Sequence, residues 1–141
     1  MARNRTRSRL APRNERGAVA VEFALVVPVL LLLVLGMIDF GRLWFTQVSL
    51  SQAAREGARL EALGSSRVYS GTTGAATGFS GLTVYINGTQ YSADPSPIVA
   101  CPSGSDATVR VVYPNFTFTL GALIGLGPKT LAGKGVMPCG G

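Results

Sequence analysis

The sequence predicts an α+β fold in which a long N-terminal membrane-spanning helix continues into an exported amphipathic helix packed on a small antiparallel sheet. Three observations favour this fold. Residues 18–38 carry a single charged side chain, residues 39–63 have a helical repeat without proline, and residues 64–141 hold short alternating runs separated by turn residues. The chain of 141 residues therefore divides into a leader, a membrane segment, an exported helix and one small domain.

Residues 1–17 form a basic leader that we expect to be cleaved. Six arginines in this segment oppose only Glu15, which gives a net charge of +5, whereas the rest of the chain carries +1. Lys and Arg beside a membrane segment keep that end in the cytoplasm, so the C-terminal part is expected outside. A basic tract can also bind nucleic acid. This one has no aromatic residues and its charge is explained by the orientation, so we expect no nucleic-acid partner.

Residues 18–38 form the predicted transmembrane helix, because about 20 apolar residues span a hydrocarbon core. Glu22 is the charged residue in this segment. A charged side chain near the bilayer centre costs about 2.5–3.5 kcal/mol, which the many apolar neighbours can offset. An ionisable group within a membrane segment is by default a candidate functional residue. If Glu22 instead reaches the cytoplasmic interface or is protonated, it needs no partner.

Residues 39–63 form the predicted exported helix, and Gly64 is a suitable stop. Side chains at spacings of three or four residues change along this helix from aromatic to alanine. The aromatic residues Phe40, Trp44 and Phe45 are expected at the membrane interface, where aromatic belts lie. The alanine end could pack against the chain's own domain or against another subunit.

Residues 64–141 form the predicted β-rich exported domain. Asn87-Gly88 between two alternating runs is the strongest short signal for a hairpin. A small sheet of three to five strands needs a helix over one face, and the exported helix is the candidate. The expected elements are a loop at 65–80, strands at 82–86, 89–92, 107–113, 116–120 and 129–137, a chain break at Pro114, and a loop or short helix at 121–128.

Cys101 and Cys139 both fall in the exported domain, and the chain has no other cysteine. An even number of cysteines in a small exported domain indicates a disulfide. Two unpaired thiols are the alternative. Two cysteines without any histidine supply too few soft ligands for a metal site, so no metal is expected.

The sequence also lacks the residues of common catalytic sites. It has no histidine, no nucleophile elbow and no phosphate-binding glycine loop. We therefore expect a protein that is not an enzyme and has no cofactor and no small-molecule substrate.

The remaining candidate site is the junction between leader and membrane segment. Gly17 has no side chain, so a peptidase could close tightly around the backbone there. Cleavage would leave a free amine on Ala18, and Glu22 lies four residues later, about 6 Å along one helical face. A neighbouring helix displaced by one turn could then pair its Glu22 with this amine, which would neutralise two charges in lipid.

Several motifs resemble the TadE-like family, the minor pilin-like proteins (pseudopilins) of the tight-adherence, Flp-type pilus system. The resemblance covers residues 16–63 closely and residues 64–141 more loosely. Its motifs are Gly17-x4-Glu22-Phe23, the apolar run with Pro28, Asp39-Phe-Gly41, the run Ala-Ala-Arg-Glu-Gly-Ala-Arg at 53–59, and the segments 107–114 and 135–139.

The resemblance implies that a prepilin peptidase cuts between Gly17 and Ala18, and that the product takes part in assembling a Flp-type adhesion pilus. The implied partners are major and minor pilin subunits and an inner-membrane assembly platform. The implied location is the bacterial cytoplasmic (inner) membrane, with pilus association or release after processing. Glu22 corresponds to the acid at the fifth mature position of type IV pilin-like proteins, whereas Phe23 stands where major Flp pilins usually have tyrosine. The large exported domain favours a minor, tip or initiating subunit.

Two other functions remain open at this point. The chain could be an uncleaved single-pass anchor whose exported domain binds a partner without polymerising. It could also be a soluble domain released by ordinary signal peptidase after Gly36, although that site lies inside the apolar run. The mature N-terminus separates the three functions: Ala18 for the pilin-like subunit, Met1 or Ala2 for the anchor, and a residue near 37 for the released domain.

Overall fold

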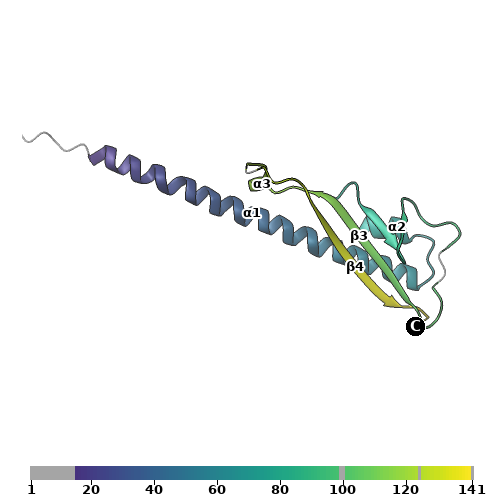
Figure 1. The fold of residues 1–141 in the computed structure, drawn as a ribbon. Helices are drawn as coiled ribbons and strands as arrows, with labels where there is room; N and C mark the ends of the chain where they lie inside the picture. Colours follow the sequence, from purple (N-terminus) through teal and green to yellow (C-terminus); the bar gives the residue numbers. More distant parts are fainter. Residues whose placement is uncertain (1–14, 99–100, 124, 141) are drawn as a thin grey trace, which may run out of the picture. The chain divides into compact units, whose positions relative to one another are not determined.

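The computed structural model describes residues 15–98, 101–123 and 125–140. Its elements follow in the order α1, α2, β1, β2, β3, α3, β4 (Figure 1). The chain divides into two compact units, Met1–Val34 and Leu35–Gly141, which we call the N-terminal unit and the C-terminal unit. A long apolar helix and a small antiparallel sheet are both present, which confirms the predicted α+β class.

Helix α1 (Glu15–Ala62) contributes to both units. It begins three residues before Ala18, inside the predicted leader, and residues 1–14 of that leader lie outside the described residues. The helix ends as expected before Gly64, whose φ of 64° is the left-handed conformation that glycine adopts without strain. The N–H groups of Gly64 and Ser65 donate to the carbonyls of Glu61 and Leu60, both at 2.9 Å, and so satisfy the last turn.

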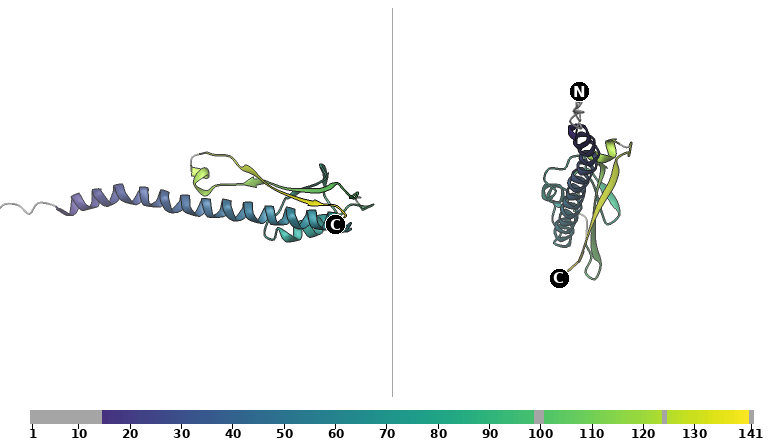
Figure 2. Two further views of the ribbon diagram at one scale, coloured as in Figure 1. Left: turned by 90° about the horizontal axis from the view of Figure 1, so that it is seen from below. Right: turned by 90° about the vertical axis from the view of Figure 1, so that its left-hand side faces the viewer.

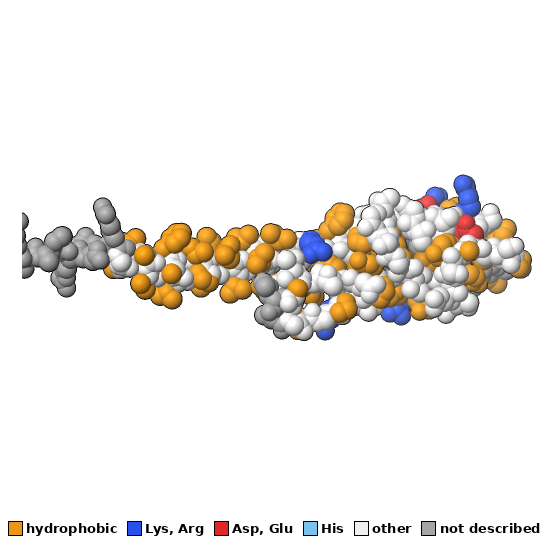
Figure 3. Space-filling view, turned by 90° about the horizontal axis from the view of Figure 1, so that it is seen from above, with side chains coloured by type: hydrophobic (Ala, Val, Ile, Leu, Met, Phe, Trp, Pro, Cys, Tyr) orange, Lys and Arg blue, Asp and Glu red, His pale blue; other side chains and the backbone are white. Residues whose placement is uncertain are grey.

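The N-terminal unit consists of the apolar half of α1. The helix is long and apolar enough to cross a membrane, with a mean hydropathy of 2.8 in its most apolar window. Apart from the half-buried Val27, the large apolar side chains between Val19 and Val34 are exposed by 45–70%. Hydrophobic side chains cover the visible face of this segment, as Figure 3 shows. This helix therefore has the length and composition of a membrane anchor, and the described chain leaves most of its apolar side chains uncovered.

Four antiparallel strands form the sheet of the C-terminal unit, in the order β2-β1-β3-β4. The hairpin expected at Asn87-Gly88 is confirmed, because Ile86 pairs with Thr89 and the two turn residues have φ values of 49° and 87°. Two positive φ values define the type I′ turn, whose twist matches that of the strands. The strands are β1 (Thr83–Ile86), β2 (Thr89–Tyr91), β3 (Asp106–Phe116) and β4 (Lys129–Pro138).

Strand β3 corrects two expectations from the sequence. It does not end at Pro114, because β1 pairs only with residues 109–112 of β3 and the pairing with β4 shifts between Tyr113 and Phe116. A proline lacks an N–H and is tolerated at such an irregular position. The strand expected at 116–120 is also wrong, since β3 stops at Phe116 and helix α3 (Thr119–Leu123) follows.

The loop expected at 65–80 contains a helix instead, α2 (Val68–Ala75). Its sequence is rich in Gly, Ser and Thr, which are weak helix formers. Tertiary contacts stabilise it: Val68 and Thr72 are fully buried, and a Cβ on Gly71 would collide with the side chain of Leu60. The helix forms because it closes the core, a contact that local propensity does not predict.

The C-terminal half of α1 runs along one face of the sheet in both views of Figure 2. Two glycines of β4 allow this close approach. A Cβ on Gly133 would meet the backbone of Leu50, and one on Gly135 would meet the backbone of Ala54. The alanine end of the helix therefore packs on the chain's own sheet. The core comprises Leu50, Ala53, Ala54, Ala58, Val68, Ala76, Val84, Ile86, Val109 and Val111.

Candidate processing and assembly site

Gly17 and Ala18 lie in the first turn of α1. A Cβ placed on Gly17 would meet no atom within 4 Å, in contrast to Gly133 and Gly135. The fold therefore has no packing requirement for glycine at position 17. The first N–H groups of a helix also lack intrahelical acceptors, so this turn unwinds at low cost.

Glu22 and Phe23 follow one turn later on the same helix. Phe23 is 68% exposed and Glu22 is also exposed. Within the described residues, Glu22 has neither a hydrogen bond nor an ion pair, although four other carboxylates of the chain have them. Its neighbours on α1 are the exposed apolar side chains of the N-terminal unit.

The three predicted interface aromatics are all exposed, Phe40 by 65% and Trp44 and Phe45 by 66% each. They do not form one cluster. Phe40 and Trp44 stack with their centroids 6.4 Å apart, whereas Phe45 points to another side of the helix and lies 6.5 Å from the ring of Phe79. The three predicted interface aromatics therefore lie on two sides of the helix and not on one face.

Asp39 is a buried acid that the sequence analysis named only within the motif Asp39-Phe-Gly41. Its side chain is 4% exposed, and its two oxygens accept the backbone N–H groups of Thr119 and Leu120, each at 2.8 Å. Arg42 lies 3.7 Å away and also donates to the Thr119 hydroxyl at 3.1 Å. Asp39 thus fixes the start of α3 to α1 across 80 residues of sequence. An acid directly after an apolar segment is the signal that could have drawn attention to it.

Glu61 is a second buried acid that the sequence did not single out. It is fully buried, accepts one hydrogen bond from the Asn87 amide at 3.1 Å, and its second oxygen has no partner within the described chain. Burial raises the pKa of Glu61, an effect that the bond from Asn87 only partly opposes. Asn87 also accepts the N–H of Thr108 at 2.9 Å, so this pair joins α1 to the hairpin turn.

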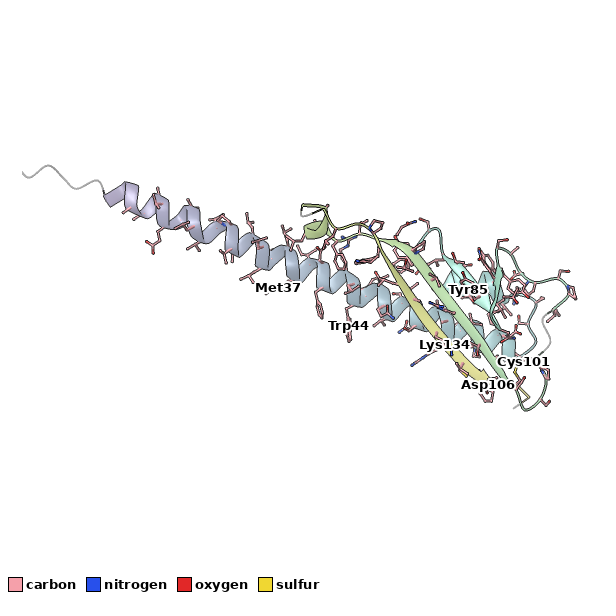
Figure 4. The ribbon with its side chains drawn as sticks, viewed as in Figure 1. Met37, Trp44, Tyr85, Cys101, Asp106 and Lys134 are labelled. Carbon is pink, nitrogen blue, oxygen red and sulfur yellow. A yellow bond between two sulfur atoms is a disulfide. The ribbon has the colours of Figure 1, made fainter. Side chains whose placement is uncertain are left out.

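Cys101 and Cys139 form a disulfide, with their Cα atoms 5.6 Å apart. The bond ties the segment before β3 to the end of β4, and the Cys139 N–H also donates to the Ser105 carbonyl at 2.8 Å. Figure 4 shows Cys101 and Asp106 at the end of the sheet far from Trp44 and Met37. The disulfide therefore stabilises the distal end of the C-terminal unit and takes no part in the junction site.

The described residues contain no group of three or more His, Cys, Asp or Glu side chains placed to hold a metal ion. The junction contains a peptide bond between two small residues, Gly17 and Ala18, at the start of a long exposed apolar helix. The carboxylate of Glu22 follows one turn later.

Comparison with known proteins gives a match that includes the junction. Residues 17–59 match the family model described as TadE-like protein. The match begins at Gly17, includes Glu22 and Phe23, and ends within the packed part of α1. It confirms the resemblance for this part of the chain. Neither a curated protein nor a solved structure matches the sequence.

Proposed function

We propose that this protein is a minor pilin-like subunit that takes part in assembling a Flp-type adhesion pilus. It inserts into the bacterial inner membrane with its leader in the cytoplasm and the C-terminal unit outside. A prepilin peptidase cuts after Gly17, and the processed helix joins major and minor pilin subunits at the assembly platform. The role is structural and not catalytic.

The observation that carries this proposal is the carboxylate of Glu22 on an exposed apolar helix, without a partner in the described chain. An ionisable side chain in such a segment is by default a candidate functional residue. The glycine at position 17, which the fold does not require, supplies the second half of the argument. Both residues lie at the start of the segment that matches the TadE-like model.

Cleavage and pairing are linked in this proposal. Removal of the leader gives Ala18 a positive amine about 6 Å along the helix from the carboxylate of Glu22. Because the two groups of one chain lie on one helical face, an adjacent subunit shifted by one turn aligns its carboxylate with this amine. The pairing cancels two charges that are costly in lipid and sets the stagger between neighbouring helices.

The mature N-terminus tests the proposal. Mass spectrometry of the protein from its native membrane is expected to show a chain that starts at Ala18. Gly17→Leu should leave the leader attached, because the peptidase then meets a bulky side chain. Gly36→Leu is the matched control, since a Cβ on Gly36 also meets no atom within 4 Å, and this variant should be cut normally.

Two outcomes contradict the proposal. A chain that starts at Met1 or Ala2 would indicate an uncleaved anchor whose outer unit binds a partner. A start near residue 37 would indicate a released soluble domain.

A further inference from the structure

The loop around α3 lies beside the part of α1 that directly follows the apolar segment. Asp39 accepts hydrogen bonds from the backbone of Thr119 and Leu120. An apolar hollow of about 260 Å³ lies between this part of α1 and the loop. The residues that form this hollow are almost entirely apolar and include Gly36, Phe40, Leu43, Phe118, Leu120 and Leu126. Since Gly36 belongs to the predicted membrane segment, this loop reaches the level at which the helix leaves the bilayer.

We propose that the described residues of this loop, 118–122 and 125–126, insert into the interface of the lipid bilayer and bind its outer surface. Ala122 and Leu126 of the loop are exposed, Leu126 by 52%, whereas Phe118 and Leu120 are half-buried. On another side of the same helical stretch, Met37 is exposed by 72% and Trp44 by 66%. Figure 4 shows Met37 and Trp44 on the side of α1 away from α3. Apolar side chains of the loop and of α1 therefore lie on opposite sides of this helical stretch. This is expected for a segment placed in the membrane–water interface.

Four backbone donors of the loop meet the condition that lipid imposes. Unpaired N–H groups are costly at membrane depth, so irregular chain is tolerated there only when its donors are satisfied. Asp39 accepts two of them, the Ala122 N–H donates to the Phe118 carbonyl at 3.1 Å, and the Leu126 N–H donates to the Gly121 carbonyl at 2.8 Å. The carboxylate of Asp39 is thereby stabilised by two backbone N–H groups and by Arg42, 3.7 Å away.

The charges beside the loop fit an anionic lipid surface. Arg42 lies over the Phe116 ring, 5.8 Å from its centroid, and Lys129 is exposed where β4 begins. Asp39, which is buried, is the only acid between residues 36 and 55, and the sequence has no acid after Asp106. Basic residues at the rim of an apolar patch attract anionic headgroups.

Fluorescence quenching by labelled lipids tests this proposal on the full-length chain. Trp44→Phe removes the single native tryptophan, and Leu126→Trp then places a probe at an exposed position of the loop. The protein is reconstituted at low density into vesicles of phosphatidylcholine and phosphatidylglycerol that carry bromine near the headgroup end of the acyl chains. We expect the Leu126 probe to be quenched several-fold more than a probe at Val136, a 47% exposed residue of β4.

Two further variants make each outcome decisive. Leu31→Trp reports insertion of the helix, and an unquenched Leu31 probe would overturn the membrane anchor and the loop proposal together. A quenched Leu31 probe with a Leu126 probe quenched no more than Val136 would overturn the loop proposal alone. A blue-shifted but unquenched Leu126 probe would contradict it too, because it indicates a protein partner. Asp39→Asn should reduce quenching at Leu126 and leave Leu31 unchanged, since the loop loses its anchor to α1.

Discussion

The two halves of helix α1 are both apolar, but they differ in the size and the exposure of their apolar side chains. Between Val19 and Val34 the apolar side chains are large and exposed, whereas between Leu50 and Ala58 most are small and fully buried. In the second stretch, Ala54 faces Gly135 of β4, and the backbones of helix and strand come into contact. One continuous helix therefore meets two different surroundings.

The difference shows which unit buries its apolar side chains within the chain itself. The C-terminal unit buries its alanines and valines within itself and needs no second molecule for its core. The N-terminal unit exposes most of its apolar side chains and the carboxylate of Glu22. Its covering must come from lipid and from other subunits. Changes in the sheet should therefore affect folding of the C-terminal unit alone, and changes near Glu22 should affect assembly alone.

The largest expected effect on the C-terminal unit comes from the disulfide. Cys101→Ser opens a loop with a sequence separation of 38 and should lower the free energy of unfolding by about 4 kcal/mol. Urea unfolding of the detergent-solubilised full-length chain measures this, and helicity of the N-terminal unit should persist in the micelle. Reduction of the wild-type protein should reproduce the loss, and the non-reducing gel shift should vanish in the variant. An unchanged urea midpoint in both samples would contradict the prediction.

A smaller but more local effect is expected at the contact between helix and strand. Gly135→Ala places a methyl group against the backbone of Ala54 and should destabilise the C-terminal unit by about 3 kcal/mol, because neither backbone can move away freely. Gly127→Ala is the matched control, since a Cβ there meets no atom within 4 Å. The same urea titration should leave the control near the wild type. Equal effects of both variants would show that the close approach does not contribute to stability.

Glu61→Gln should have the smallest effect, and its sign depends on pH. Burial raises the pKa of Glu61 in the folded state, so its stabilising contribution is complete below the unfolded pKa of about 4.3 and is lost as pH rises through the folded pKa. The variant has no charge at this position. It should match the wild type near pH 4 and exceed its free energy of unfolding by about 1 kcal/mol at pH 8. The same pH dependence in both proteins would rule out a buried charge at this position.

Local patterns predicted the elements that depend on local physics. The helix from the membrane segment to Gly64, the Asn87-Gly88 hairpin and the last strand follow from periodicity and turn chemistry. Helix α2 could not be predicted, because its Gly and Thr residues are helical only through contacts with Leu60 and the core. The path of β3 through Pro114 likewise depends on where β1 ends beside it.

The functional candidates also separate into residues that the sequence predicts and residues that only the fold reveals. Gly17, Glu22 and Phe23 stand out in the sequence because a glycine and an acid interrupt a basic-to-apolar transition. The buried roles of Asp39 and Glu61 were not predictable. Their partners, Thr119 and Asn87, lie 80 and 26 residues away, and only the folded chain brings them together.

Recovery of Glu22 variants in assembled fibres tests the central claim most directly. The protein with Glu22→Gln is compared with wild type after its membrane insertion and its N-terminus at Ala18 have been verified. A control with Glu22→Val and Val26→Glu keeps one carboxylate but moves it one turn along α1. We predict that both variants insert, and that neither is recovered with sheared fibres. Normal fibre output and normal recovery of the Glu22→Gln protein would contradict the pairing of this carboxylate with a neighbouring amine.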